Sequence, residues 1–242
     1  MNLEGRAAPA RARPGDLRAL AERSLELPAM PVVATRVIQA VASSTATVAE
    51  VAALIGGDPV VTTWVMRVVN SAAYGRQRTV SSLVQAVSLL GFKEIKSLVI
   101  SASMRTLCRA FGPAEQRLWR HAVCTALGAR LVARRVSRAL EDEAFLAGQL
   151  HDVGKIVLRN HLGEALSRAE ALAAELGPTA GEEHVLGFAH TDVGSLLVQR
   201  WGLPQAVEVA AFYHHDLELC GSLAAEHLPL VACVTLADVL AH

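Results

Sequence analysis

The sequence predicts an all-α protein built from two closely packed helical subdomains. Apolar residues recur mostly at three- and four-residue intervals between turn signals, which is the period of an amphipathic helix. We find no sustained alternation of apolar and polar residues flanked by hairpin turns, as exposed strands would require. Capping and helix-stopping residues stand at the ends of the periodic segments. These three observations together favour helices over sheet along the whole chain.

Two early helices follow from their capping residues. Thr47 and Glu50 form a capping-box pattern, in which each side chain satisfies a free backbone N–H in the first turn of a helix. This helix is expected over residues 47–56 and to end at glycines. Asp58 and Pro59 then start a second helix that runs to about residue 70, because Asp accepts hydrogen bonds at an N-cap and Pro suits the first helical position.

The remaining helices are predicted from apolar periodicity between Gly and Pro breaks, with Gly91 as a stop signal. They cover residues 82–90, 93–107, 114–136, 143–151, 163–176, 192–201, 204–214 and 228–241. The break at Phe111, Gly112 and Pro113 is the predicted boundary between the subdomains. We therefore expect a flexible leader over residues 1–15, an N-terminal helical subdomain over 16–110 and a C-terminal helical subdomain over 113–242.

Charge and hydropathy exclude several classes of partner. Lys plus Arg and Asp plus Glu both number 23, so no net field attracts nucleic acid. The arginines at positions 130, 134, 135 and 138 are interpreted as a solvated helix face, since no aromatic platform for bases accompanies them. No uncharged apolar stretch of about 18 residues is present for a membrane span. The N-terminus also lacks the apolar core of a secretory signal, so we expect a cytoplasmic protein.

The four cysteines are scattered, without a CxxC pair or a dense disulfide framework. We interpret them as reduced thiols buried in the core, because free Cys behaves as a small hydrophobic residue. They are Cys108, Cys124, Cys220 and Cys233.

All nine histidines lie after residue 120, which places any histidine chemistry in the second subdomain. His151 and Asp152 are adjacent at a predicted helix end, where Val153 and Gly154 allow the irregularity that lets neighbouring side chains converge. Lys155 lies on roughly the same face and could bind a phosphate oxygen. Imidazole and carboxylate together suit divalent ions such as Zn, Fe or Mn.

Ordinary structural roles compete with these assignments. A histidine at a helix end is often only capped or solvated, and an isolated His-Asp pair is weak evidence for a metal site. Four other histidines are expected to lie at the surface or to make local hydrogen bonds; they are His161, His184, His227 and His242.

Several separated motifs, in order, resemble the HDOD family of HD-related output domains. In the first half they are LPAMP at 27–31, GGDPVVTTWVMRVVNSAAYG at 56–75 and SSLVQAVSLLGF at 81–92. In the second half they are WRHA at 119–122, FLAGQLHDVGK at 145–155, EEHVLGFAHTDVGSLLVQRWGLP at 182–204, and the pair His214 and His215. The resemblance covers nearly the whole chain and implies that the second subdomain is an HD-like helical bundle. The polar motif residues of the first half, such as Asp58, Asn70, Ser71 and Tyr74, are interpreted as structural, with Asn70 and Ser71 bonding to backbone at a helix end.

The resemblance also implies a ligand set for one or two divalent ions. His121, His151, Asp152 and Asp238 match the four ligands of HD phosphohydrolases. His190, His214 and His215 are similar to the extra ligands of the HD-GYP cyclic dinucleotide phosphodiesterases. Asp152 and Lys155 would be the catalytic residues, and Asp192 could orient a histidine from outside the ligand set.

Three departures from the HD-GYP pattern limit what is carried over. Arg117 stands one turn before His121, where some members have an acidic ligand, so we expect no third ion. The segment after His215 is DLELCGSL rather than a Gly-Tyr-Pro loop, which argues against hydrolysis of cyclic di-GMP and leaves binding open. The sequence also stops soon after Asp238, so a later helix of the family fold is expected to be missing.

Two functions are consistent with these patterns. The first is a cytoplasmic bacterial signal-transduction output module that recognises a signalling protein partner or a nucleotide second messenger, with or without a bound metal. The alternative is a metal-dependent phosphohydrolase or phosphodiesterase acting on a nucleotide or cyclic nucleotide, in which bound ions lower the pKa of a water molecule. The sequence leaves the oligomeric state open.

Overall fold

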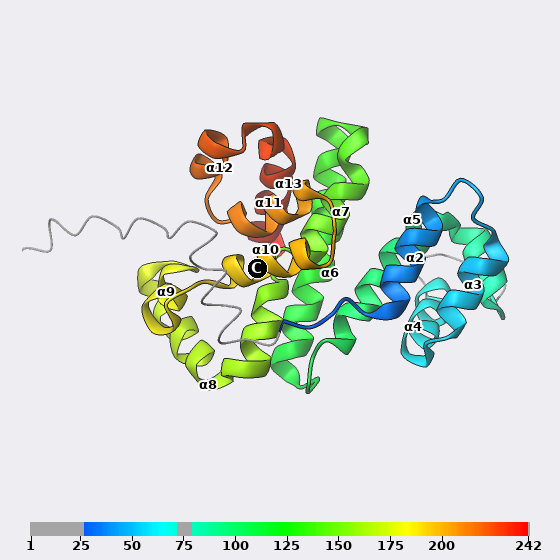
Figure 1. The fold of residues 1–242 in the computed structure, drawn as a ribbon, viewed down its shortest axis with the longest axis horizontal. Helices are drawn as coiled ribbons and strands as arrows, with labels where there is room; N and C mark the ends of the chain where they lie inside the picture. The colour runs from blue at the N-terminus through cyan, green and yellow to red at the C-terminus, as the bar shows by residue number, and fades with distance from the viewer. Residues whose placement is uncertain (1–26, 72–78, 242) are drawn as a thin grey trace, which may run out of the picture.

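The computed structural model describes residues 27–71 and 79–241, and these residues form helices joined by turns with no strand among them (Figure 1). The predicted all-α fold is confirmed. The predicted leader over residues 1–15, Tyr74 and His242 lie outside the described residues.

Four helices form the first part of the described chain. They are α2 (Val32–Ala42), α3 (Val48–Gly56), α4 (Pro59–Val69) and α5 (Leu83–Thr106). The capping box of α3 is confirmed, since Glu50 N donates to Thr47 Oγ1 at 3.2 Å and Thr47 N donates to Glu50 Oε2 at 3.1 Å. Asp58 caps α4 by accepting the N–H groups of its first turn. Helix α2 was not among the predicted helices.

Asn70 and Gly91 also behave as their residue types suggest. The Asn70 amide nitrogen donates to Met66 O at 3.0 Å and Val80 O at 2.9 Å, and its oxygen accepts from Val80 N at 2.8 Å. Asn70 therefore bonds to backbone, as predicted. Gly91 interrupts α5 with a φ of 76°, which glycine adopts without steric cost. The predicted stop between residues 90 and 93 is thus a break within one long element.

The second part of the chain contains the longer helices of the bundle. They are α6 (Pro113–Val136), α7 (Glu141–Leu150), α8 (Val153–Leu176), α9 (Ala180–Leu186), α10 (His190–Arg200), α11 (Gln205–Tyr213), α12 (Leu217–Leu223) and α13 (Leu228–Ala241), with short 3-10 helices at Arg138–Leu140 and Ala225–His227. The sequence predicts α8 only from residue 163, whereas the helix begins at Val153 and is kinked at Leu162. The short helices α9 and α12 were not among the predicted helices.

The buried hydrophobic side chains of the described residues form two clusters. One contains α2, α3, α4 and most of α5, with Val37, Ile55 and Val65 fully buried. The other lies among α6 to α13 and also takes Ile100 and Met104 from the end of α5. In Figure 1 the two groups of helices stand side by side, joined through α5. The end of α5 packs in the second cluster, so the two buried clusters do not divide the chain at residues 111–113. The domain boundary there stays a prediction.

A few polar and aromatic contacts join the two groups of helices. Arg130 on α6 donates to Glu94 Oε1 at 2.6 Å and to Ser97 Oγ at 2.7 Å on α5, and its guanidinium lies over the Phe145 ring. The prediction that Arg130 belongs to a solvated face is therefore wrong, because α5 covers this side of α6. The other three arginines of that run are exposed.

The cysteine prediction is half right. Cys220 and Cys233 are buried and Cys108 is partly buried, but Cys124 is exposed. Cys124 lies on the outer face of α6. The prediction of its burial rested on residue type alone. All four thiols are free. Burial, followed by Glu115, raises the pKa of Cys108 to about 11.

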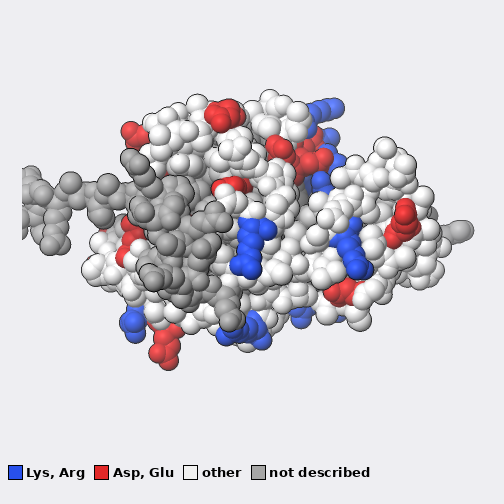
Figure 2. All heavy atoms as spheres, viewed as in Figure 1, with Lys and Arg blue, Asp and Glu red and all other residues white. Residues whose placement is uncertain are grey.

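The described surface carries charges of both signs. Figure 2 shows Lys and Arg side chains interspersed with Asp and Glu on the face in view, without a single-sign field. No helix in the described residues is both long enough and apolar enough to cross a bilayer.

Candidate metal centre

The predicted site residues come from five different helical segments of the second part. His121 lies on α6, and His151 and Asp152 occupy the two-residue break between α7 and α8. This break is the helix-end irregularity that the sequence suggested. The others are His190 at the start of α10, His214 and His215 directly after α11, and Asp238 on α13.

Two glycines let the backbone around His151 and Asp152 approach its neighbours closely. A Cβ at Gly148 would lie 2.8 Å from Ala126 Cα on α6, and a Cβ at Gly154 would lie 2.0 Å from His190 O on α10. Real Cβ atoms do not approach so closely, so both positions require glycine. These contacts bring the α7–α8 break against both α6 and the start of α10.

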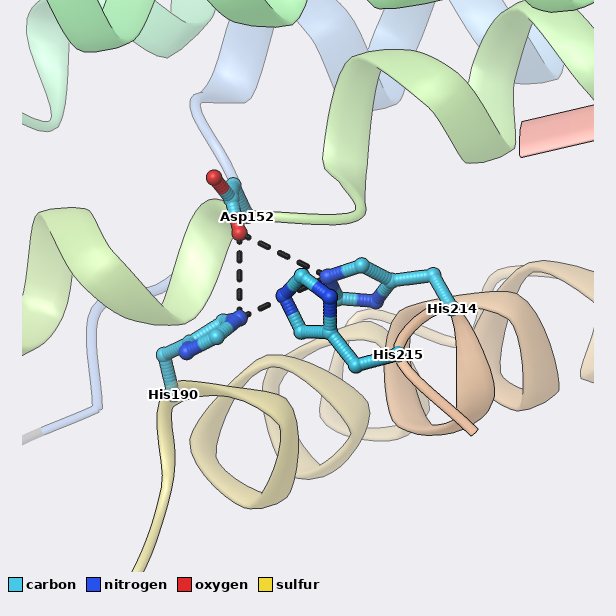
Figure 3. A group of neighbouring side chains, drawn as sticks. All are labelled: Asp152, His190, His214 and His215. Carbon is cyan, nitrogen blue, oxygen red and sulfur yellow. Dashed lines mark hydrogen bonds and ion pairs between the residues drawn. The ribbon is translucent and has the colours of Figure 1, made fainter. Parts of the chain in front are cut away.

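All seven predicted ligands meet in two adjacent groups. His121, His151 and Asp238 form one group, and Asp152, His190, His214 and His215 form the other. Within each group the ligand atoms lie within 4.8 Å of one another. Figure 3 shows the side chains of the second group gathered at Asp152.

The Asp152 carboxylate lies between the groups and offers one oxygen to each. Its Oδ1 is 3.1 Å from His190 Nε2 and 3.6 Å from His214 Nε2. Its Oδ2 is 3.5 Å from His151 Nε2 and 3.7 Å from His121 Nε2. Asp238 Oδ1 completes the first group at 2.9 Å from His121 Nε2. The arrangement suits two ions that share one carboxylate.

Two histidine rings are held by backbone carbonyls so that their Nε2 atoms face the centre of the cluster. His151 Nδ1 donates to Gly148 O at 2.8 Å, and His214 Nδ1 donates to Ala210 O at 3.2 Å and Ala211 O at 3.1 Å. A carbonyl oxygen cannot donate, so Nδ1 must carry the proton in both rings. In the neutral imidazole this leaves a lone pair on Nε2, which is the form that binds a metal.

At the centre of the cluster the Nε2 atoms of His151 and His214 are consequently acceptors, and each faces a ring nitrogen of another histidine. His121 Nε2 and His151 Nε2 are 3.1 Å apart, and His190 Nε2 and His214 Nε2 are 3.4 Å apart. Asp152 Oδ1 is buried and accepts no hydrogen bond from the described residues. Buried acceptors that face one another without donors are unfavourable unless a cation lies between them. The donor set therefore fits divalent metal ions of the Zn, Fe or Mn type.

Burial and neighbouring charges shift the pKa values of several groups in the cluster. Burial alone would raise the pKa of Asp152, but Lys155 and the nearby histidines hold it well below its usual range. Burial lowers the pKa of His214 to about 4 and also strongly lowers that of His215. These two rings therefore stay neutral, as ligands must be.

Lys155 lies where the sequence placed it. Its ammonium group donates to Asp152 Oδ2 at 2.8 Å. Its side chain is 19% exposed, and those of His121 and His215 are 11% and 14% exposed, while His151, His190 and His214 are fully buried. Solvent thus reaches the cluster beside Lys155, His121 and His215.

One carboxylate beside the cluster was not among the predicted site residues. Glu182 on α9 is buried, and its Oε2 accepts from both the backbone nitrogen and the ring Nδ1 of His190. Asp192, which was expected to orient a histidine, accepts from Ala189 N at 2.7 Å and so caps α10. Glu182 stands in the motif that carries the resemblance, but its role depends on the unpredicted helix α9.

The histidines assigned to ordinary roles lie apart from the two ligand groups. His184 is exposed on α9, and His161 and His227 are partly buried. His227 lies 3.8 Å from the carboxylate of its neighbour Glu226. These positions agree with surface or local roles.

Solved structures with the same fold cover almost all of the chain. An HDOD domain protein of unknown function from Geobacter sulfurreducens matches with a TM-score of 0.80 and 29% identity, over 94% of this chain and 77% of that one. A protein from Shewanella amazonensis named “Putative metal-dependent phosphohydrolase” matches with a TM-score of 0.66 and 22% identity, over 93% and 80%. A protein from Marinobacter aquaeolei named “Putative signal transduction protein” matches with a TM-score of 0.72 and 24% identity, over 93% and 54%. At identities below 25%, the last two show likeness of fold alone.

A curated relative and a family model complete the comparison. An uncharacterized protein of Treponema pallidum is 25% identical over 223 residues, which are 91% of this chain. The match spans only 43% of that relative's length, so the relative is much longer. The model of the HDOD domain matches residues 27–217, which is most of the chain and includes every predicted ligand except Asp238. The resemblance seen in the sequence motifs is thereby confirmed, and the chain belongs to the HDOD domain family.

Proposed function

We propose that the C-terminal bundle of this chain binds two divalent metal ions and hydrolyses a phosphate ester, with a nucleotide or cyclic nucleotide as the substrate class. The observation that carries the proposal is the convergence of unprotonated acceptors. Nε2 of His151 and His214, held by Nδ1 donation to carbonyl oxygens, faces the two oxygens of Asp152 in a buried centre. This preorganised donor set favours a metal over an ordinary core, in which donors and acceptors are paired.

The ligands divide between the ions as the two groups do. His121, His151 and Asp238 would hold one ion, while His190, His214 and His215 would hold the other, and Asp152 would contact both. Divalent ions in such a site supply Lewis acidity, which lowers the pKa of water to near neutral and offsets phosphate charge.

Lys155 and the partly exposed rim define where substrate enters. The Lys155 ammonium group lies beside Asp152 and is reached by solvent, so it can bind a phosphate oxygen as a point charge. Asp152 keeps Lys155 charged and directed to the cluster, because its carboxylate outweighs the effect of burial and raises the pKa of the lysine. In this arrangement Lys155 would contact substrate, and Asp152 would help to hold both ions. The choice of a nucleotide rests on family analogy alone.

The test is metal analysis and turnover on protein purified without a histidine tag. We expect up to two equivalents of Mn or Fe per chain and hydrolysis of bis(p-nitrophenyl) phosphate in the presence of that metal. His151→Ala should abolish turnover and remove at least one equivalent. His184→Ala, which removes an exposed histidine from α9, is the matched control and should change neither.

A second candidate, an output module that recognises a signalling protein or a nucleotide second messenger, is favoured by one contact network. Ser101 of α5 accepts from Trp119 Nε1 at its backbone oxygen and donates its hydroxyl to Gln149 Oε1, each at 2.9 Å. Trp119 and Gln149 each stand two residues before a predicted ligand. The N-terminal helices are thus tied to the two segments that carry His121 and His151.

The same experiment separates the two candidates. Folded protein that binds no added Mn or Fe would contradict the proposed hydrolase function and favour the output module. Protein that binds metal stoichiometrically but turns over no phosphodiester would indicate a metal-stabilised recognition module.

A further inference from the structure

Glu182 is the buried carboxylate that the ligand set does not include. It lies on α9, is 2% exposed, and directs a single oxygen, Oε2, at two groups of the same residue. That oxygen accepts from His190 N at 2.6 Å and from His190 Nδ1 at 2.7 Å. By comparison, the Asp238 carboxylate lies 4.0 Å from Nδ1 of the predicted ligand His215.

The fold holds Glu182 in place through close contact between α9 and α8. A Cβ at Gly181 would lie 2.6 Å from Ala169 O, so the start of α9 is pressed against the middle of α8. At the start of α10, Asp192 accepts the N–H of Ala189, and Glu182 accepts the N–H of His190, the first residue of the helix. Burying a carboxylate is unfavourable unless the interactions with its partners offset the loss of hydration. Helix capping accounts for the contact of Glu182 with the backbone N–H of His190, but its contact with the ring Nδ1 calls for a further explanation.

When the His190 ring is neutral, two carboxylates compete for its one proton. Glu182 Oε2 faces Nδ1 at 2.7 Å, and Asp152 Oδ1 faces Nε2 at 3.1 Å. If the proton stayed on Nε2, it would point at Asp152 and block the lone pair that a metal needs. With the proton on Nδ1, Nε2 is bare and faces the second ligand group. His151 and His214 reach the same result by donating to backbone carbonyls, whereas His190 relies on a side chain.

We propose that Glu182 is a positioning residue that holds the proton of His190 on Nδ1 and so keeps Nε2 available to the ion of the group formed by Asp152, His190, His214 and His215. This inference rests on the proposed metal-binding function for its consequence, but its structural part concerns the tautomer of one ring. A carboxylate that bonds the outer nitrogen of a histidine ligand also makes that ligand more basic. Loss of such a partner typically costs about 10- to 100-fold in metal affinity.

The first measurement is the tautomer of His190 in metal-free protein, read from long-range ¹H–¹⁵N NMR spectra at alkaline pH, where the rings are neutral. In the wild type we expect a proton on Nδ1. In Glu182→Ala the proton should move to Nε2, because Asp152 Oδ1 becomes the nearest carboxylate acceptor. Glu182→Gln keeps an oxygen acceptor at this position and should retain the Nδ1 proton. The ring signals of His190 are identified as those that are absent from the spectrum of His190→Asn.

The second measurement is calorimetric titration of the same variants with Mn²⁺. Glu182→Ala should bind one equivalent about 10- to 100-fold more weakly, while the equivalent held by His121, His151 and Asp238 keeps its affinity. Glu182→Gln should recover most of the loss. Glu183→Gln, one residue further along α9, is the matched control and should bind as the wild type does. A general loss of structure would lower the affinity of both equivalents together. A loss confined to one equivalent therefore identifies a positioning role.

The outcomes separate this inference from the proposed function. If His190 keeps its proton on Nδ1 in Glu182→Ala, the positioning role is wrong, whatever the metal affinities are. If both equivalents weaken equally in Glu182→Ala, Glu182 is structural. If the wild type binds no Mn²⁺, the proposed function fails, and the tautomer measurement still decides the role of Glu182. Should Glu182→Ala fail to fold, Glu182→Met replaces it, because Met keeps the volume and removes the acceptor.

Discussion

The ligand cluster depends on glycines as much as on histidines. Gly148 and Gly154 flank the pair formed by His151 and Asp152, and each stands where a Cβ would strike the backbone of a neighbouring helix. The first allows α7 to approach α6, and the second allows the start of α8 to reach His190 on α10. The histidines supply the donor atoms, but these contacts decide whether the atoms meet.

Gly154→Ala should destabilise the fold and separate the two ligand groups. The new Cβ would lie 2.0 Å from His190 O, so the start of α8 or of α10 must move. We expect a loss of about 3 kcal/mol or more in the free energy of unfolding, at the upper end of overpacked cores, measured by urea denaturation.

The matched control is Gly163→Ala, also on α8, where a new Cβ meets no atom within 4 Å. There alanine should be neutral or stabilise by up to about 1 kcal/mol through its better helix propensity. Equal stability of the two variants would show that the approach of α8 to α10 is not tight.

Helix ends place most of the chemistry in this chain. His151 and Asp152 lie between two helices, His190 begins α10, and His214 and His215 follow the last residue of α11. On a continuous helix, neighbouring side chains point about 100° apart, so an adjacent pair could not serve one centre. The breaks allow adjacent residues to converge. Caps that fix where helices begin therefore also fix where ligands lie.

The capping box of α3 offers a test of this local control away from the metal centre. Thr47→Ala removes the acceptor of the Glu50 N–H and should lower the free energy of unfolding by about 1 kcal/mol. Thr63→Ala, at an exposed position within α4, should instead be neutral or slightly stabilising because Ala favours helix. Thermal unfolding followed by circular dichroism measures both. A Thr47→Ala variant as stable as Thr63→Ala would show that the box contributes nothing.

Across the molecule, the two buried clusters are joined through α5. Its last turns pack in the second cluster, and Ser101 links Trp119 of α6 with Gln149 of α7. Trp119 also meets Trp64 of α4 edge to face, with ring centroids 4.7 Å apart. A change in the N-terminal helices therefore has a direct route to the segments that carry His121 and His151.

Ser101→Ala should weaken this connection. The substitution removes the hydroxyl that donates to Gln149 Oε1, and Gln149 Nε2 already has no hydrogen-bond partner among the described residues. We expect a loss of about 1–3 kcal/mol, the usual cost of a buried unpaired polar group, measured by chemical denaturation. Ser222→Ala, which removes an exposed hydroxyl bonded to Glu218 O, should cost much less. Equal effects would contradict a structural role for the Ser101 link.

The local sequence was sufficient for the fold class, the caps and the identity of the clustered residues. The helix that starts at Pro59, the break at Gly91 and the helix over 228–241 all follow from short-range rules about caps, glycine and periodicity. The seven clustered residues were found from their residue types and from motif resemblance. Both kinds of signal lie within a few neighbouring residues.

Contacts between segments distant in sequence decided the rest. Helix α9 and the role of Glu182 escaped prediction, because a carboxylate on a short helix has no local pattern that points to a ring on the next helix. The same reason explains Arg130, which is covered by α5, and Cys124, which is exposed. Periodicity identifies the apolar face of a helix, but which polar side chains are enclosed depends on the helices that pack around them.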